Sequence, residues 1–335
     1  MKEALFYESC GNGEAYCGLC PHNCLISNGH TGNCIARSNK DGVLFTEIYG
    51  KVVSLNFDPI EKKPFYHFCP GSHILSLGTF GCNFHCDFCQ NSEISQPEPG
   101  SFININDTAP EVAISVSLSR RNNTGLAFTY NEPAIWYEYI MDTAKLSHEK
   151  GLRNVMVTNG YINEEPLKQL LQYIDAFNVD IKSFNNHFYM KYTSANIEPV
   201  KKNIIGIKKA DRHLELTFLA IPGLNDAPGE FAELTKWIES EAGSNTILHI
   251  NRYFPSYKMN LEPTPYETLE RLYNIAASRL DYVYIGNTRE AELSNDTKCC
   301  ACKNPVIKRN CYNVSLNGLD DKGYCKYCNN KVAIC

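Results

Sequence analysis

The stretch HILSLGTFGCNFHCDFCQN, residues 73–91, is the most informative segment of the sequence. Residues 73–78 are mostly apolar and end in glycine, which is typical of a buried β-strand. The following loop holds three cysteines at C-x3-C-x2-C spacing: Cys82, Cys86 and Cys89. Three such thiolates can hold three irons of a cubane cluster and leave the fourth iron open to a ligand, whereas an electron carrier closes its cluster with four cysteines. The alternative is a zinc knuckle completed by His85 or a distant residue.

Cysteine is the residue whose number stands out, with 16 among 335 residues. The length predicts about two domains, or one large α/β domain with appendages. The N-terminal segment lacks the apolar core of a signal peptide, and no apolar run reaches the roughly 18 residues of a membrane span. We therefore expect a cytoplasmic protein whose clustered cysteines are metal ligands or free thiols rather than disulfides. The net charge of −5 argues against broad attraction to nucleic acid.

Short β-branched or aromatic runs alternate with amphipathic stretches after residue 73, which is the pattern of βα units around a parallel sheet. The expected strands are residues 73–78, 125–130, 154–158, 176–181, 214–221, 246–251 and 282–286. An eight-stranded barrel takes about 250 residues, and this region has about 220 with fewer strands. We therefore predict an α/β protein with an open or partial barrel, whose ligand face lies at the carboxyl ends of the strands.

Three helices have readable signals. Thr108 and Glu111 form a T-x-x-E capping box, and a second helix opens at Pro133 and closes before Gly151. Residues 264–280 place apolar side chains on one face, which predicts an amphipathic helix.

The sequence divides into three parts. Residues 1–60 are expected to form a Cys-rich N-terminal cap, in which residues 43–49 and 52–57 pair as a hairpin. Residues 61–295 form the partial barrel. Residues 296–335 form a tail that is too short to fold without a metal or a docking surface.

Both ends of the chain carry a second kind of cysteine pattern. The tail has two C-x2-C knuckles that predict a zinc ribbon, with an iron site or no metal as alternatives: Cys299, Cys302, Cys325 and Cys328. The cap has four cysteines that could bind zinc or an auxiliary iron–sulfur cluster, or stay without metal: Cys17, Cys20, Cys24 and Cys34. His22 is a substitute ligand there. Five thiols have no assignment: Cys10, Cys69, Cys300, Cys311 and Cys335.

The loop and the strand ends resemble the radical S-adenosylmethionine (SAM) superfamily. The similarity extends through FTYNEP (128–133), VTNGY (157–161), NVDIKSF (178–184), IPGLND (221–226), HINRYFP (249–255) and YIGN (284–287). Their order resembles the pyruvate formate-lyase-activating-enzyme-like branch, and most closely the AmmeMemoRadiSam-system enzymes, over nearly the whole chain. The resemblance implies a radical SAM core built as a partial (β/α)6-type TIM barrel.

The resemblance also implies site residues. The cysteines of the loop at 82, 86 and 89 would bind a [4Fe-4S] cluster, and Phe88 would lie near the SAM adenine. Glu132 would accept a hydrogen bond from the SAM amino group, although Tyr130 and Asn131 stand where the family has glycines. Thr158 and Asn159 would face the SAM ribose or carboxylate.

Three further expectations concern the later strands. Asp180 and Lys182 lie two apart on a strand, hence on the same side, and such a pair suits the zwitterionic methionine moiety. Ile221 is expected to line the adenine pocket. His249 and Arg252 are expected to contact a carboxylate or phosphate of the substrate, since both can donate hydrogen bonds.

The function that the resemblance implies is reductive cleavage of SAM to a 5′-deoxyadenosyl radical, which then abstracts hydrogen from an unidentified substrate. It requires a low-potential electron donor of the flavodoxin or ferredoxin type. The substrate could be a glycine of a partner protein, as for a glycyl-radical-enzyme activase, or another molecule. The alternative class is a zinc-ribbon scaffold that binds nucleic acid, which the acidic net charge and the lack of a basic or aromatic stripe disfavour.

Overall fold

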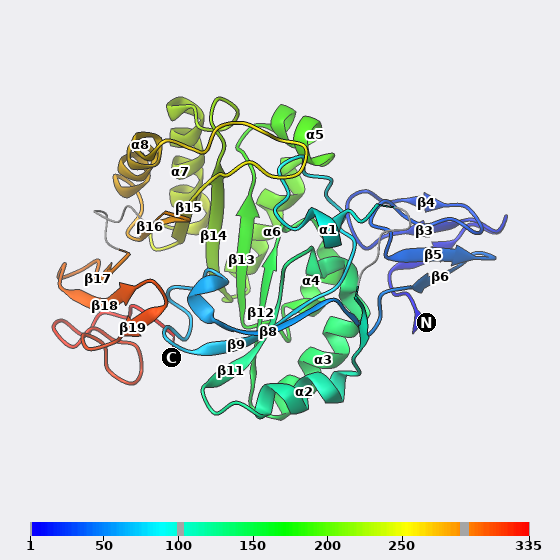
Figure 1. Ribbon diagram of the computed structural model, residues 1–335, viewed down its shortest axis with the longest axis horizontal. Coiled ribbons are helices and arrows are strands. Elements are labelled where there is room, and N and C mark those ends of the chain that lie inside the picture. Colours follow the sequence, from blue (N-terminus) through cyan, green and yellow to red (C-terminus); the bar gives the residue numbers. More distant parts are fainter. Residues whose placement is uncertain (1, 99–103, 289–294, 335) are drawn as a thin grey trace.

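The computed structural model describes residues 2–98, 104–288 and 295–334. Its centre is a sheet in which seven neighbouring strands run parallel and one edge strand, β8, runs antiparallel (Figure 1). The strands follow one another across the sheet in chain order: β8 (Ser54–Pro59), β9 (His73–Gly78), β11 (Asn123–Phe128), β12 (Arg153–Thr158), β13 (Ala176–Ile181), β14 (His213–Ala220), β15 (Ile247–Arg252) and β16 (Val283–Gly286).

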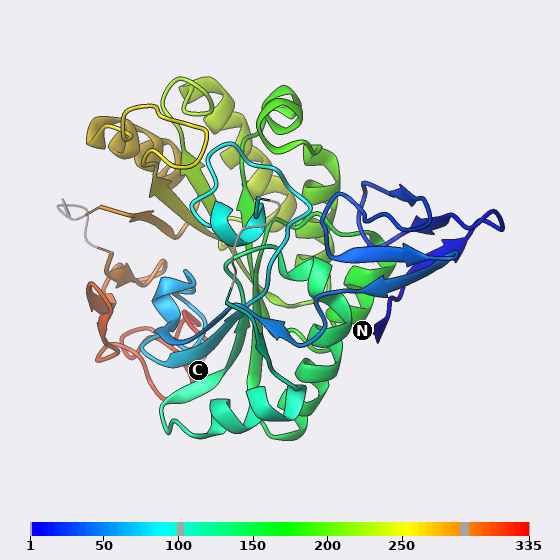
Figure 2. The same cartoon turned by 45° about the vertical axis from the view of Figure 1, so that its right-hand side comes forward.

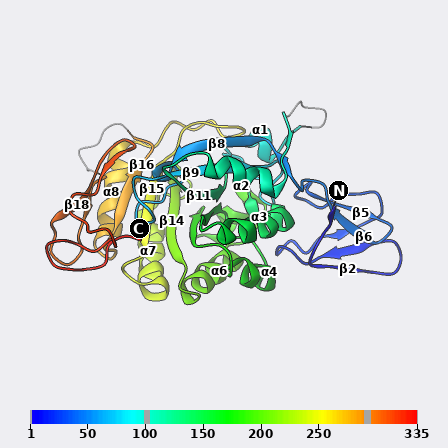
Figure 3. The same ribbon diagram turned by 90° about the horizontal axis from the view of Figure 1, so that it is seen from below.

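This order without reversal explains the shape of the sheet. Right-handed crossovers between successive parallel strands all place their helices on the same face. Figure 3 shows these helices along the outer side of a curved sheet. Their bounds are α2 (Pro110–Leu118), α3 (Tyr137–Glu149), α4 (Glu164–Leu170), α5 (Asn186–Thr193), α6 (Ile197–Lys209), α7 (Pro228–Ala242) and α8 (Tyr266–Ala277). The two edge strands, β8 and β16, do not pair with each other, so the predicted open α/β barrel is confirmed.

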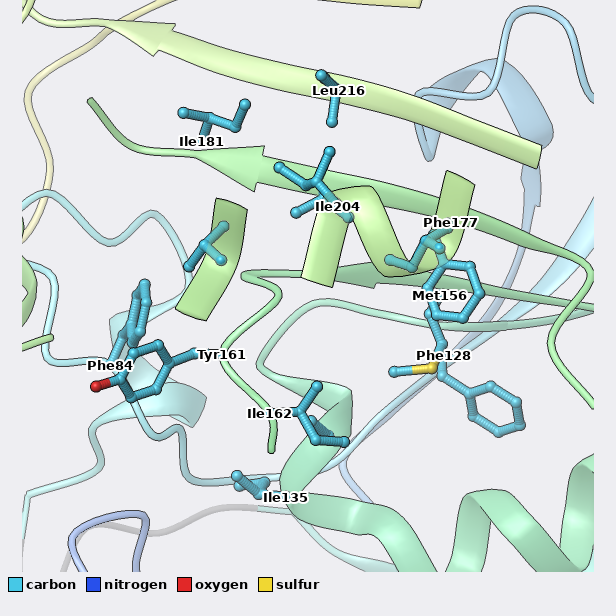
Figure 4. Packing of buried hydrophobic residues seen from close by; sticks show 14 of the residues in the cluster. Phe84, Phe128, Ile135, Met156, Tyr161, Ile162, Phe177, Ile181, Ile204 and Leu216 are labelled. Atoms are coloured by element: carbon cyan, nitrogen blue, oxygen red, sulfur yellow. The ribbon is translucent and has the colours of Figure 1, made fainter. Parts of the chain in front are cut away.

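The outer face of the sheet packs against the helices to form the main core. Large apolar side chains on successive strands, Phe128, Met156, Phe177 and Leu216, are fully buried in the same cluster as Ile204 of α6 (Figure 4). Because side chains alternate between the faces of a strand, the residues between them point into the barrel.

Side chains fill the interior of the barrel only near the amino ends of the parallel strands. There a segment that includes the 3-10 helix η1 (Ile60–Lys62) inserts Ile60, Phe65 and Phe68 against inward-facing Ala127 and Ala176. Nearer the carboxyl ends of the strands no such plug is present among the described residues, and the interior opens into a cavity.

The predicted hairpin of residues 43–49 and 52–57 is wrong. The strand β6 (Val43–Thr46) pairs with β5 (Arg37–Lys40) across Asp41-Gly42, where φ is 54° and 85°. An Asp-Gly pair with two positive φ angles forms the preferred two-residue hairpin turn. The later strand β8 instead pairs with β9, so residues 54–59 of the predicted cap belong to the central sheet.

Two of the three helix predictions are confirmed, and the predicted capping box is wrong. The helix that opens at Pro133 is confirmed as the 3-10 turn η2 (Pro133–Trp136) followed by α3, and residues 264–280 contain α8. The capping box is wrong, because Ala109 is the N-cap of α2 and Thr108 bonds back to Asn106 instead.

Small sheets lie at opposite ends of the central one (Figure 2). The N-terminal ones are built from β1 (Lys2–Glu3), β2 (Tyr7–Ser9), β3 (Ala15–Cys17), β4 (Leu25–Ile26), β5 and β6, and a short pair joins β7 (Lys51–Val52) to β10 (Asn106–Asp107). The C-terminal one has β17 (Thr297–Lys298), β18 (Pro305–Asn310) and β19 (Asn313–Ser315). Among the described helices, none is long and apolar enough to cross a membrane.

Candidate functional site

A cavity of about 490 Å³ lies at the carboxyl ends of the parallel strands. This position is where parallel α/β barrels bind their ligands, and the volume is in the range of small-molecule sites. The lining draws on the ends of β9 and β11 to β16, and includes most of the residues that the sequence singled out: Cys82, Cys86, Phe88, Cys89, Asn131, Glu132, Thr158, Asn159, Asp180 and Lys182.

The three cysteines of the loop after β9 all line this cavity. Cys86 is buried, and burial raises the pKa of its thiol to about 12. Burial also raises the pKa of Cys82 well above its ordinary value. Bare thiolates are therefore disfavoured here, and a metal centre would have to supply the positive charge that deprotonates them.

Glu132 is a buried carboxylate with both oxygens bound. Its Oε1 accepts hydrogen bonds from Thr158 Oγ1 at 2.6 Å and from Ala134 N at 2.8 Å, and its Oε2 accepts one from Asn159 N at 2.7 Å. Burial raises its pKa to about 7, although these donors act in the opposite direction. Glu132 thus caps η2 and also lines the cavity, where its carboxylate can face a ligand.

Tyr130 and Asn131, which the resemblance places at glycine positions, have distinct local roles. Tyr130 has a φ of 76°, a left-handed conformation that a glycine adopts more easily. Asn131 accepts a hydrogen bond from Thr79 N at 3.2 Å and donates one to Gly81 O at 2.8 Å. The Asn131 side chain therefore braces the loop that carries the first cysteine.

Thr158 and Asn159 end β12 beside Glu132. The Asn159 amide donates to Asn83 Oδ1 at 2.8 Å, and Asn83 in turn donates to Tyr161 O at 2.8 Å. Asn83 directly follows Cys82, so this hydrogen-bond network connects the carboxyl end of β12 to the cysteine loop.

Asp180 and Lys182 form an ion pair inside the cavity, with 2.8 Å between Lys182 Nζ and Asp180 Oδ2. Burial alone would lower the pKa of Lys182, but the charge of Asp180 and its hydrogen bond to the ammonium raise that pKa. The pair therefore presents one fixed positive and one negative group to a ligand.

Phe88 is nearly buried and packs against Phe188 of α5, with ring centroids 5.9 Å apart. Its position beside Cys89 gives the cavity an aromatic wall. Leu219 of β14 adds an apolar surface.

Three predicted residues lie outside the cavity lining. His249 is buried one layer deeper on β15, where its Nε2 lies 2.6 Å from Glu215 Oε2. The guanidinium of Arg252 instead donates to Thr264 O at 2.8 Å. Ile221 is fully buried beneath the turn after β14. The contacts that these three residues make here are structural, and the substrate and adenine contacts predicted for them stay predictions.

Other lining residues were missed from the sequence. Asn251 lies two positions after His249 on the same face of β15, and Asn287 follows β16. The alternation of strand residues and the motif ending at 287 were signals that could have found them. Tyr312 reaches the cavity from the C-terminal tail, and nothing local in the sequence indicates this placement.

The four cysteines of the tail converge. The Sγ atoms of Cys299 and Cys328, and those of Cys302 and Cys325, lie 3.6 Å apart, and all four lie within 4.8 Å of one another. A tetrahedral zinc ion with bonds of 2.3 Å to sulfur would place its ligands about 3.8 Å apart. The donor set therefore fits a single ion such as zinc.

The N-terminal set of four, at positions 17, 20, 24 and 34, lines a separate small cavity. Among the unassigned thiols, Cys10 and Cys311 are exposed and Cys69 and Cys300 are partly buried. Cys335 lies outside the described residues.

Comparison with known proteins adds independent evidence. The sequence profile of the Radical SAM superfamily matches residues 76–236. Uncharacterized protein MJ0808 of Methanocaldococcus jannaschii is 42% identical over 337 residues, which cover all of this chain and 99% of that protein. The (2S)-3-sulfopropanediol dehydratase activating enzyme of Klebsiella oxytoca is 22% identical over 43% of this chain and 45% of its own.

Two further matches extend the comparison. The 4-hydroxyphenylacetate decarboxylase activating enzyme of Clostridium scatologenes is 23% identical over 68% of this chain and 65% of its own length. The structure of a radical SAM methyltransferase from Sphaerobacter thermophilus has the same fold, with a TM-score of 0.52 at 15% identity, over 68% of this chain and 69% of that one. With its three-cysteine loop at the mouth of an open parallel barrel, the chain belongs to the radical SAM superfamily and is a radical SAM enzyme.

Proposed function

We propose that this enzyme binds a [4Fe-4S] cluster through Cys82, Cys86 and Cys89 and binds SAM at the fourth iron, then cleaves SAM reductively to start hydrogen abstraction from a substrate. The observation that carries the proposal is that three cysteines share one cavity with a carboxylate, a lysine–aspartate pair and an aromatic wall. No fourth cysteine belongs to the described lining.

The donor set fits this cofactor pair. Unlike the tail cysteines, these three do not gather their sulfurs within 4.8 Å among the described residues, as a single ion would require. A cubane distributes its ligands over separate irons. The rest of the cavity offers both charges and an apolar wall, which matches a zwitterionic amino acid joined to an adenosine.

The residues of the chain would act by positioning and by excluding water. Glu132, which three hydrogen-bond donors hold in place, would accept a hydrogen bond from the SAM amino group. The Lys182 ammonium would face the carboxylate, with Asp180 keeping it charged. Phe88 and Leu219 would cover the adenosine. A preorganised site of this kind needs no rearrangement when the radical forms.

The chemistry would come from the cofactors: Cys82, Cys86 and Cys89 would hold the cluster, which would supply the electron for reductive cleavage of SAM to methionine and a 5′-deoxyadenosyl radical. The electron would come from a low-potential donor of the flavodoxin or ferredoxin class, which suits a protein working in the cytoplasm.

The test is production of 5′-deoxyadenosine. Protein reconstituted with iron and sulfide without oxygen, then given dithionite and SAM, should form 5′-deoxyadenosine and methionine. Cys86→Ala should abolish the product, while Cys311→Ala, an exposed thiol away from the cavity, should not. Equal product from the two variants would refute the proposal.

A narrower candidate is activation of a glycyl-radical enzyme. It is supported by the similarity to the Klebsiella and Clostridium relatives, both of which are named as activating enzymes. Incubation with a co-encoded glycyl-radical enzyme should then give the doublet of a glycyl radical in the electron paramagnetic resonance (EPR) spectrum. A source genome without any such enzyme would favour another substrate, as would membership of the AmmeMemoRadiSam branch.

We further propose that the tail binds Zn²⁺ as a structural cap. The four converging cysteines support this, and so do contacts of the tail with the barrel plug: His67 Nδ1 donates to Val332 O at 2.7 Å, and Arg309 donates to Tyr66 O at 2.6 Å. Cys302→Ser should lose about one zinc per chain in elemental analysis. A nucleic-acid scaffold instead predicts salt-dependent RNA or DNA binding.

A further inference from the structure

The four cysteines of the N-terminal cap line a cavity of about 20 Å³. They are Cys17, Cys20, Cys24 and Cys34. One water molecule needs about 10–15 Å³ in the same measure. The four cysteines therefore line a space that has room for at least one water molecule.

This geometry distinguishes a cluster from a zinc ion, and the chain provides its own reference. A zinc ion holds sulfur at about 2.3 Å, which leaves no room for even a water molecule between four thiolates. The tail cysteines have that compact arrangement, with sulfur pairs 3.6 Å apart. Among the described residues, no three ligand atoms of the cap gather within 4.8 Å of one another.

The alternative ligand, His22, has one ring nitrogen engaged. Its Nε2 lies 2.7 Å from Asn83 O and donates to this carbonyl, which leaves only Nδ1 for a metal. Among the residues that line the cavity, the four cysteines alone offer thiol ligands. Four thiolates close all the irons of a cubane, which suits electron transfer and leaves no iron open to SAM.

We propose that Cys17, Cys20, Cys24 and Cys34 bind a second [4Fe-4S] cluster, which passes electrons to the central one. The binding of this cluster stands on its own geometry; the electron transfer rests on the proposed function of the cavity at Cys82.

A buried arginine supports a negatively charged occupant. Arg37 lines the cavity, is fully buried, and donates to Cys17 Sγ at 3.7 Å. Its charge is shared with Glu138 and with Leu5 O, at 2.6 Å from Arg37 Nη1. Hydrogen bonds to ligand sulfur stabilise the electron that a cluster accepts, so Arg37 would raise the reduction potential of this site.

The two cysteine sets touch through their backbones. Asn83 lines the second cavity while its neighbour Cys82 lines the first. A Cβ placed on Gly81 would lie 2.4 Å from the carbonyl oxygen of Cys34, which shows how closely the loops approach. In the transfer, a reduced flavodoxin or ferredoxin gives one electron to the second cluster (2+ to 1+), which returns to 2+ as the central cluster goes from 2+ to 1+.

The first experiment counts metals in the full chain. The wild type, reconstituted without oxygen, should hold about eight irons and about one zinc, and a variant with Cys82, Cys86 and Cys89 all changed to Ala should hold about four irons and one zinc. A triple variant with no iron, or with two zinc ions, would overturn the inference. Because that variant cannot cleave SAM in any case, failure of the proposed function is read separately, from 5′-deoxyadenosine in the wild type.

The second experiment tests the transfer. Cys17→Ala/Cys34→Ala should still cleave SAM with dithionite, a small reductant that reaches the central cluster directly. The same variant should lose cleavage driven by reduced flavodoxin or ferredoxin, whereas Cys10→Ala, an exposed thiol of the cap, should keep it. Undiminished cleavage with the protein donor in the double variant would overturn the transfer.

Discussion

Replacing Gly81 with alanine should destabilise the protein more than the same change at Gly29. Both glycines have a left-handed φ, 85° and 78° respectively. The left-handed conformation destabilises an alanine by about 1–2 kcal/mol at either site, so this contribution cancels in the comparison. The difference lies in the surroundings: a Cβ at Gly81 would be 2.4 Å from Cys34 O and 3.0 Å from Ile35 Cγ1, whereas Gly29 has nothing within 4 Å.

The magnitude follows from this clash. Forcing a methyl group into a packed contact costs about 1–3 kcal/mol. Each kcal/mol lowers the melting temperature by about 2–4 °C in a domain of 150–250 residues. Gly81→Ala should therefore melt several degrees below Gly29→Ala.

The assay is thermal unfolding without oxygen, followed by near-ultraviolet circular dichroism, with iron analysis of the same samples. Gly81→Ala should also retain less iron after desalting, because it pushes Cys34 away from the loop that carries the central cysteines. Equal melting temperatures and equal iron in the two variants would refute the close packing of the two cysteine loops.

Three other predictions test the barrel interior. Glu215→Ala should lower the free energy of unfolding by about 3–5 kcal/mol, because the hydrogen-bond donors that now bind this buried carboxylate would be left unpaired. Glu239→Ala, which removes an exposed ion pair, should change it by no more than about 1 kcal/mol. Equal melting temperatures of the two variants would contradict this. Burial lowers the pKa of His67 from its ordinary 6.5 to about 3, so below pH 6.5 the unfolded chain binds more protons than the native one. As the pH is lowered from 6.5 to about 3, this histidine should reduce the free energy of unfolding by about 1.4 kcal/mol per pH unit. The decrease should be shallower in His67→Asn. Asn251→Ala should weaken SAM binding in equilibrium dialysis without lowering the melting temperature. His249→Asn should lower the melting temperature without weakening SAM binding. The opposite pattern would mean that His249, and not Asn251, contacts the ligand.

The fold could be predicted largely because its signals are local. Each parallel strand is a short apolar run, and each is followed by polar residues that mark its carboxyl end. The cysteine loop is also local, since three ligands within eight residues need no information from elsewhere in the chain. These two facts place Cys82, Glu132, Thr158 and Lys182 around one cavity.

Depth inside the barrel could not be predicted in this way. Alternation tells which face a residue occupies, but His249 and Asn251 share a face. Which of them meets the cavity depends on how far the plug of Phe65 and Phe68 fills the barrel. That plug comes from residues outside the strands, so no strand pattern reveals it.

Contacts between distant segments escaped prediction for a similar reason. The approach of Cys34 to Gly81 joins two loops that are separated in the chain by β5 to β9, and Tyr312 reaches the cavity from the tail. The hairpin error has a local cause instead: Asp41-Gly42 is a stronger turn signal than Gly50-Lys51, the pair that lies between the two predicted strands.

The central claim is that SAM binds at the cavity of Cys82, Cys86 and Cys89 through its amino and carboxylate groups. The most direct measurement is electron–nuclear double resonance of the reduced protein with SAM isotopically labelled at these two groups. The account predicts that both labels couple magnetically to the cluster and that the coupling disappears in Cys86→Ala. Bound SAM without coupling from either label would contradict it.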